Sequence, residues 1–189
     1  MRQYWQRGIF MGAIGLLGGL LGSGVAAQAT PTTPSWGHWA TTELTYHCTE
    51  NTPDNRTVWR RAVRNWNRTG VVRLRAVPRD QPANISLTTA ATIGRPDQRL
   101  AGYTNYAFYR RPAGKLIISA EAQLNQHILT THRYTKQQRT SVATHELGHA
   151  LGLAHSRSAK SLMYHANRNG KIGAAEKRAV RAAHQLSDH

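Results

Sequence analysis

Apolar residues recur at helical spacing over residues 57–69. They fall on one side of a helix, three and four positions apart, at Val58, Trp59, Ala62, Val63 and Trp66. Arginines occupy the opposite side at every fourth position, at Arg60, Arg64 and Arg68. Pro53 suits the start of this helix and Gly70 suits its end. The pattern predicts a half-buried helix with a basic outer face.

The alternating or aromatic-rich runs typical of strands lie at residues 43–48, 71–77, 84–88, 100–109 and 115–124. Residues 125–134 are expected to form a loop. Two further helices are predicted at 135–151, where Thr135 and Gln138 suit a capping box, and at 174–185. Five strands and three helices in the order β-α-β-β-β-β-α-α predict an α+β fold.

The first 29 residues have the organisation of an export signal. Arg2 and Arg7 precede an apolar stretch, and Ala27-Gln28-Ala29 is a small-residue cleavage site. We expect cleavage after Ala29, which leaves residues 30–189 as a single, monomeric, secreted domain with no lasting membrane span. An uncleaved anchor is the alternative, because residues 8–27 are about long enough to span a bilayer. The small-residue site favours cleavage.

The charge of the chain indicates a further class of binding partner. The chain has 25 Lys and Arg against 9 Asp and Glu, a formal charge of +16 at pH 7. Loss of residues 1–29 would remove two arginines and no acid, which leaves +14. A field of this sign predicts attraction to polyanions, such as an anionic cell-wall polymer, and the arginine face of the first helix is the best local candidate. Solubility in an acidic or salty medium is the alternative, and no specific nucleic-acid binding is expected.

The candidate chemistry lies in the run HELGHALGLAH, residues 145–155. Residues four apart on a helix lie roughly 40° apart around its axis, so His145 and His149 can share one metal ion. Glu146 is one step along, where a general base for an activated water is needed. Gly152 can adopt the positive φ that ends a helix, and His155 can then return as a third nitrogen ligand. Three protein ligands leave a fourth position open, which is typical of catalytic zinc.

These eleven residues resemble the zinc signature of the metzincins, and Ser156 narrows the resemblance to the matrixins, the family of the matrix metalloproteinases and their small bacterial relatives. Residues 161–164, Ser-Leu-Met-Tyr, resemble the Met-turn of that family, whose methionine (here Met163) lies beneath the ligands. The resemblance covers most of residues 36–185. It implies a twisted mixed sheet of about five strands with three helices and a zinc cleft beneath the edge strand.

The resemblance also implies a substrate site and one catalytic Zn²⁺. An extended protein or peptide substrate would pair with a strand at Leu100–Thr104, which makes Leu100, Gly102 and Tyr103 candidate substrate contacts. Tyr164 would lie in the wall of a side-chain pocket. Animal matrixins also carry a structural zinc and calcium before the zinc helix. Residues 89–125 here offer only Asp97 and Glu121 as acids and no histidine, so structural calcium is not predicted.

Three other residues have open roles. His127 and His132 are weak candidates for an ancillary metal site. Cys48 is the only cysteine, which excludes an intramolecular disulfide, and it is expected to be a small buried hydrophobe. A thiolate that blocks the zinc is the alternative, but no matching propeptide motif is present.

The function expected from these features is that of a secreted, extracellular zinc endopeptidase. Two alternatives stay open. One is a zinc amidase or endopeptidase directed at the cell wall. The other is a cationic, envelope-binding protein with little turnover, favoured by the charge but opposed by the presence of Glu146.

Overall fold

The computed structural model describes residues 4–7, 34–49, 52–93, 99–112 and 114–185. Its sheet has the strand order β1-β5-β6-β4-β2-β3, and β5 (Gly102–Arg111) is antiparallel to β6 (Gly114–Asn125). The pairs among β6, β4, β2 and β3 are parallel; these strands are β4 (Ile85–Ala90), β2 (Glu43–Cys48) and β3 (Arg73–Ala76). This mixed sheet, together with the helices, confirms the expected α+β class.

Two elements differ from the prediction. A short strand, β1 (Tyr4–Arg7), pairs antiparallel with β5 at Asn105–Phe108, and so adds a sixth strand from within the expected export signal. The expected loop at 125–134 was wrong, because it contains a helix, α2 (Gln126–Thr131). The Asn125 side chain caps α2 by accepting from the Ile128 backbone N–H at 3.3 Å. A helix of six residues is too short to show a periodic apolar pattern.

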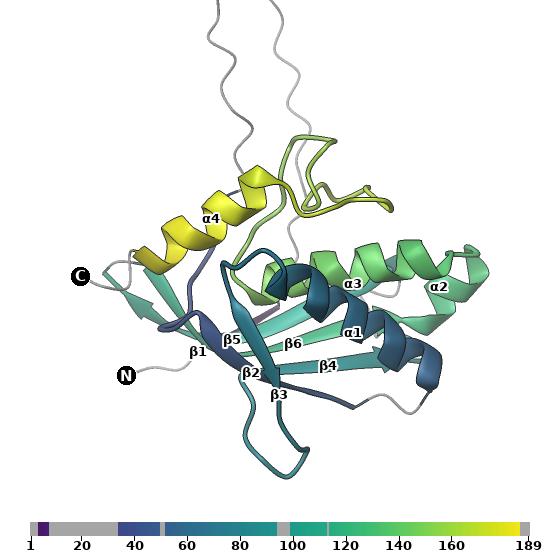
Figure 1. The fold of residues 1–189 in the computed structure, drawn as a ribbon, viewed down its shortest axis with the longest axis horizontal. Coiled ribbons are helices and arrows are strands. Elements are labelled where there is room, and N and C mark those ends of the chain that lie inside the picture. Colours follow the sequence, from purple (N-terminus) through teal and green to yellow (C-terminus); the bar gives the residue numbers. More distant parts are fainter. Residues whose placement is uncertain (1–3, 8–33, 50–51, 94–98, 113, 186–189) are drawn as a thin grey trace, which may run out of the picture.

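Helices α1 (Pro53–Asn67) and α3 (Lys136–Ala150) lie side by side over one face of the sheet (Figure 1). The predicted capping box at Thr135 and Gln138 is present at the start of α3. The indole N–H of Trp66 in α1 donates to the Thr144 carbonyl in α3 at 2.9 Å, and the Trp66 side chain is fully buried. This bond fixes the position of α3 along α1, and therefore the position of the HELGH residues over the sheet.

An extended arm at residues 34–39 joins the sheet to the segment that follows α3. Trp36 N–H donates to the Gly152 carbonyl at 2.8 Å, and Ala154 N–H donates to the Pro34 carbonyl at 2.8 Å. Further along the arm, Ile117 N–H of β6 donates to the His38 carbonyl at 2.7 Å. The arm therefore fixes the backbone just before His155 through long-range hydrogen bonds.

The last helix, α4 (Ala174–Gln185), has the predicted bounds and lies at one end of the molecule (Figure 1). Apart from β1, the expected export signal lies outside the described residues. Within the described ranges, every helix is too short or too polar to cross a bilayer.

Candidate metal centre

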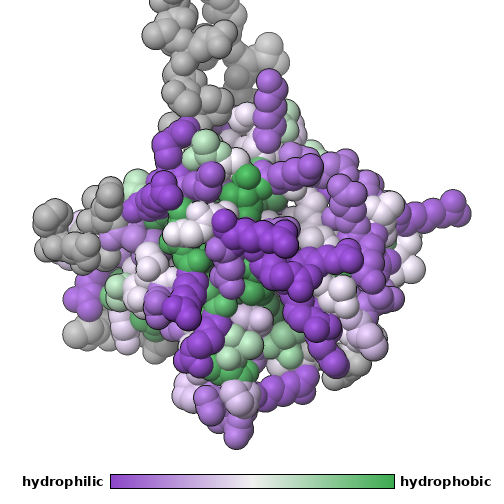
Figure 2. Space-filling view, viewed as in Figure 1, coloured by the Kyte–Doolittle hydropathy of each residue, from purple (hydrophilic) through white to green (hydrophobic). Residues whose placement is uncertain are grey.

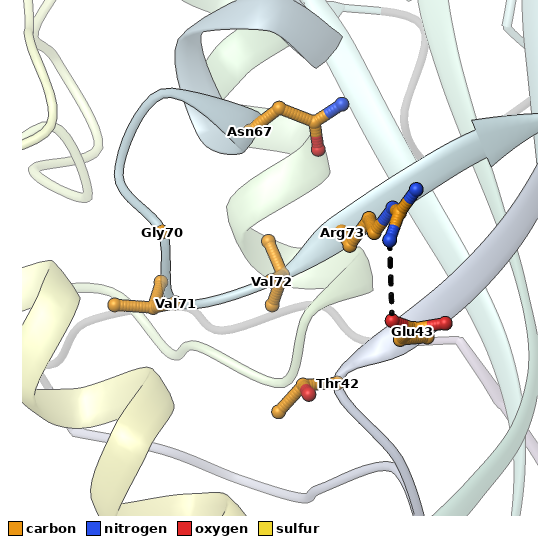
Figure 3. Close-up of a pocket in the computed structure, with 7 residues that line it drawn as sticks. All are labelled: Thr42, Glu43, Asn67, Gly70, Val71, Val72 and Arg73. Atoms are coloured by element: carbon orange, nitrogen blue, oxygen red, sulfur yellow. Dashed lines mark ion pairs between the residues drawn. The ribbon is translucent and has the colours of Figure 1, made fainter.

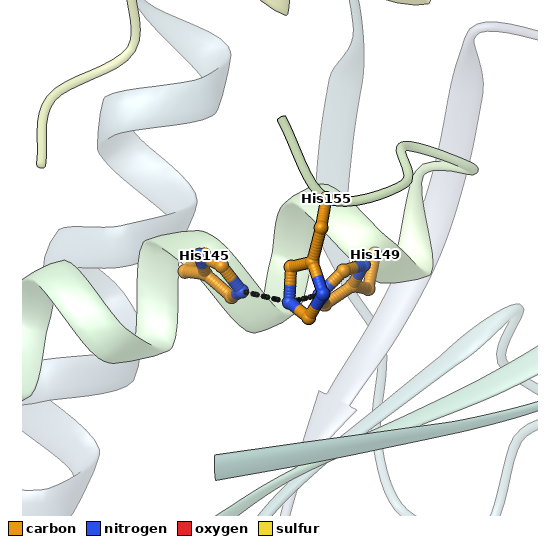
Figure 4. A group of neighbouring side chains, drawn as sticks. All are labelled: His145, His149 and His155. Carbon is orange, nitrogen blue, oxygen red and sulfur yellow. Dashed lines mark hydrogen bonds between the residues drawn. The ribbon is translucent and has the colours of Figure 1, made fainter. Parts of the chain in front are cut away.

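The three histidines of the HELGHALGLAH run converge (Figure 4). The Nε2 atom of His155 lies 3.3 Å from Nε2 of His145 and 3.2 Å from Nε2 of His149. Two nitrogens bound to one zinc at about 2.05 Å, at the tetrahedral angle, are roughly 3.3–3.4 Å apart. The spacing of the imidazole nitrogens therefore fits a tetrahedral zinc ion with one position left for water or substrate.

Carbonyl groups on the far side of two rings determine which nitrogen is free for a metal. Nδ1 of His145 lies 2.8 Å from the Leu162 carbonyl oxygen, and Nδ1 of His149 lies 2.8 Å from the Leu153 carbonyl oxygen. A carbonyl oxygen can only accept, so both Nδ1 atoms carry the proton. Both Nε2 atoms then present lone pairs toward His155, as metal ligation requires.

Burial keeps these imidazoles in the neutral form that binds metal. It lowers the pKa of His145 to about 4, although the hydrogen bond to the Leu162 carbonyl opposes this effect. The pKa values of His149 and His155 are also lowered, again mainly by burial. Neutral imidazoles at pH 7 need not lose a proton before they coordinate zinc.

The glycine at position 152 is required for two reasons. Its backbone φ of +94° is accessible to glycine and rare for other residues, so it can turn the chain after α3 toward His155. A Cβ at this position would also lie 2.1 Å from the Gly37 carbonyl oxygen in the arm. Gly152 thus permits the turn and the close approach of the arm together.

Glu146 lies against β5, the strand expected to bind substrate. Its carboxylate oxygen Oε2 accepts a hydrogen bond from the Thr104 hydroxyl at 2.8 Å. Burial raises the pKa of Glu146 to about 8, and the Thr104 hydrogen bond opposes this increase. A cation held by the three neighbouring imidazoles would lower the pKa again, because it favours the carboxylate form. Glu146 can therefore serve as a proton acceptor once the centre is loaded.

Two residues of β5 make room for this carboxylate and orient it. A Cβ at Gly102 would lie 2.6–2.8 Å from the Oε1, Cγ and Cδ atoms of Glu146, so a larger residue there would displace the carboxylate. The Thr104 side chain is buried on the same face of the strand, two residues on. Thr104 was not among the predicted site residues. A polar residue at an inward-facing position of a predicted strand is the signal that could have identified it.

Met163 is fully buried and lies directly beneath the zinc helix. A Cβ at Gly148, between the two ligands of α3, would lie 2.6 Å from the Met163 sulfur. The Ser156 N–H donates to the Met163 carbonyl at 2.9 Å, which joins the segment after His155 to the turn. Met163 therefore lies against α3 and is joined to the segment that follows His155.

A buried acid, which the sequence analysis did not single out, holds that turn in place. Glu176 is 1% exposed, and its carboxylate accepts from the Ser161 hydroxyl at 2.5 Å and from Gly173 N–H at 2.8 Å. Ser161 Oγ in turn accepts from Met163 N–H at 2.9 Å. Glu176 in α4 therefore positions Met163 through Ser161.

The other substrate candidates have mixed placements. Leu100 precedes β5 and is 44% exposed. Tyr103 is buried, and its hydroxyl donates to Asn105 on the opposite face of β5 from Thr104. The half-buried ring of Tyr164 lies 4.6 Å from the ring of His165, centroid to centroid. The ring of His165 in turn lies 6.3 Å from the His155 ring, centroid to centroid.

Among the described residues, the three ligand histidines are the one group of at least three His, Cys, Asp or Glu close enough to hold a metal. His127 and His132 therefore have no third ligand there. Cys48 does not belong to the group either; its half-buried side chain packs against the core.

A separate hollow of about 440 Å³ lies at the junction of α1, β2 and β3 (Figure 3). Its polar rim is already engaged: Asn67 exchanges hydrogen bonds with the Leu74 backbone, and Arg73 pairs with Glu43 at 3.6 Å. None of its lining residues belongs to the histidine centre.

Comparison with known proteins agrees with this geometry. A search of curated proteins gave no match. The family model described as Matrixin matches residues 38–179, a range that includes the arm from His38, the sheet from β2 to β6, the three histidines and Met163. The chain therefore belongs to the matrixin family of zinc metallopeptidases.

Proposed function

We propose that this protein is an exported zinc endopeptidase that hydrolyses internal peptide bonds, with Glu146 as its general base. The observation that carries the proposal is the convergence of three imidazoles, with Nε2 of His155 at 3.3 and 3.2 Å from those of His145 and His149, beside a carboxylate held against β5. The proposal includes residues 30–189 as the mature domain, because the family match lies wholly within them.

A zinc ion held by His145, His149 and His155 would act as a Lewis acid, which would polarise the scissile carbonyl and lower the pKa of a water molecule. Glu146 takes a proton from the attacking water and passes it to the leaving amine. Thr104 is a positioning residue in this scheme: its hydroxyl holds one carboxylate oxygen, which leaves the other free to face the water.

The substrate would add to β5 as an extended strand. Strand β1, which the mature chain would lose, pairs only with Asn105–Phe108, so the start of β5, at Gly102–Thr104, has no partner on that side among the described strands. The backbone there can bind a peptide main chain beside Glu146. Leu100, exposed just before the strand, then lies at the rim where a substrate side chain would pass.

The test is a Glu146→Gln variant of the chain from residue 30, assayed for bound zinc and for peptide cleavage. Removal of a general base costs about 10²–10⁴-fold in rate, whereas the zinc content should stay at that of the wild type. Glu121→Gln is the matched control, because it makes the same chemical change on a half-buried acid of β6 outside the centre. Unchanged cleavage by the Glu146 variant would remove Glu146 from the proposed role.

The substrate class needs its own experiment. Parallel digests of casein and of purified cell wall, each with and without a chelator, separate a general endopeptidase from a wall-directed enzyme. We expect chelator-sensitive cleavage of casein. Release of wall fragments with intact casein would assign the zinc chemistry to the wall instead.

A further inference from the structure

The outer face of α1 is a row of arginines with no acid among them. Helix α1 buries its apolar side in the core and exposes the opposite side, where it carries Arg60, Arg61, Arg64 and Arg68 beside its C-terminal half. Figure 2, in the orientation of Figure 1, shows a band of hydrophilic side chains that follows the line of this helix. We call these four side chains the arginine row.

The charge of the arginine row is not neutralised within the described part of the chain. None of the four guanidinium groups forms an ion pair there, and Asp54, the nearest acid in sequence, is already engaged. Asp54 accepts a hydrogen bond from Lys136 at 2.9 Å, and Glu43 pairs with Arg73 at 3.6 Å. The row is thus a concentrated positive charge that remains available to an external anion.

The spacing of the row fits a linear polymer of phosphates. Helical residues four apart are separated by about 6 Å along the axis, so Arg60, Arg64 and Arg68 span roughly 12 Å in two equal steps. The planar guanidinium group matches a phosphate with two parallel hydrogen bonds, which a lysine ammonium cannot do. A chain with one phosphate about every 6 Å could therefore contact all three side chains at once.

The same helix offers no platform for nucleic-acid bases. Proteins that hold single strands stack bases on exposed aromatic side chains. The two aromatic residues of α1, Trp59 and Trp66, are both fully buried. Helix α1 thus offers charge for a polymer backbone and no stacking surface of its own, which favours a phosphodiester polymer without aromatic bases.

The arginine row lies on a different element from the peptide-binding machinery. Helix α1 packs against α3 and β3, whereas Glu146 faces β5, at the other end of the strand order from β3. A polymer on the row would not need to enter the zinc cleft. Binding and hydrolysis can therefore be measured separately.

We propose that the arginine row binds a linear phosphodiester polymer of the cell envelope, such as a poly(glycerol phosphate), and holds the protein at that surface. The inference does not depend on the peptidase activity.

The experiment measures binding of the chain from residue 30 to soluble poly(glycerol phosphate) between about 50 and about 200 mM salt. The variant replaces Arg60, Arg64 and Arg68 by glutamine. A control variant replaces Lys171, Arg178 and Arg181 by glutamine, which removes the same charge from exposed positions in or just before α4.

The slope of log K, the association constant, against log salt is negative, and we expect the row variant to reduce its magnitude by about 2 to 3. Binding at 50 mM salt should weaken by about tenfold or more. The control should keep the slope of the parent chain within about 1. Both variants should keep the parent melting temperature and peptide cleavage, which shows that they are folded.

Three outcomes would overturn the proposal. Equal losses in the two variants would mean that net charge, and not the row, attracts the polymer. Tighter binding of single-stranded DNA with the same number of phosphates would identify a nucleic acid as the partner. Equal binding of poly-glutamate, again lost in the row variant, would show that phosphate is not selected.

Discussion

Replacing Gly102 by alanine tests how Glu146, the proposed general base, is positioned. The added methyl group would lie 2.6 Å from Oε1, 2.7 Å from Cγ and 2.8 Å from Cδ of Glu146. These atoms belong to a side chain and not to the backbone, so the carboxylate can move while the sheet stays in place. It must move by roughly 0.6–0.8 Å to reach 3.4 Å, the lower limit of ordinary contact.

That displacement should cost much activity and little stability. Overpacking of one methyl group in a packed site costs about 1–3 kcal/mol of the free energy of unfolding. Misplacement of a catalytic group by about 1 Å can lower the rate about 10²-fold. We therefore expect kcat/KM for a peptide to fall roughly 100-fold, with zinc content unchanged because the three imidazoles do not contact position 102.

The assay combines zinc analysis, urea unfolding and cleavage of a fluorogenic peptide. Gly70→Ala is the control, because Gly70 has a φ of +68° but nothing within 4 Å of an added Cβ. It should lose about 1–2 kcal/mol of stability from backbone strain and keep full activity. Wild-type kcat/KM in a folded, zinc-loaded Gly102→Ala protein would refute the placement of Glu146 against β5 as a requirement for catalysis.

Three further predictions concern the zinc loop, the Met-turn and the metal. Gly152→Ala should lower the free energy of unfolding by about 3 kcal/mol or more in urea and reduce zinc content, because the methyl group meets the Gly37 carbonyl and φ is +94°. Ser161→Ala should lower the free energy of unfolding, measured by calorimetry, by about 1–3 kcal/mol. It removes a hydrogen bond to buried Glu176 and the acceptor of the Met163 N–H. An unchanged melting temperature would contradict this link. Removal of the metal by a chelator should lower the melting temperature. Added zinc at about 100 times its Kd should raise the free energy of unfolding by about 2.7 kcal/mol, whereas Mg²⁺ should not raise it.

The sequence was sufficient where the chemistry depends on residues close together along the chain. The turn of an α-helix places His145 and His149 on one face whatever surrounds them, and the Gly152 turn brings back His155 within a few residues. The amphipathic pattern of residues 57–69 likewise predicted α1 and its exposed arginines, because the period of a helix is a local property.

The tertiary structure alone decided how the base and the turn are held. Thr104 and Glu146 are 42 positions apart, and Ser161 and Glu176 are 15 apart, so no periodic pattern relates them. The reasons for Gly102 and Gly148 are also visible only in three dimensions, as the Glu146 carboxylate and the Met163 sulfur fill the space that a Cβ would need.

The set of three candidate ligands therefore follows from local geometry, namely the helix for His145 and His149 and the Gly152 turn for His155. The orientation of the carboxylate, the support beneath the ligands and the arm that fixes Gly152 were decided by packing between elements. Packing depends on which surfaces meet after the chain has folded, and the residue pattern of one segment does not specify which other segment it will pack against.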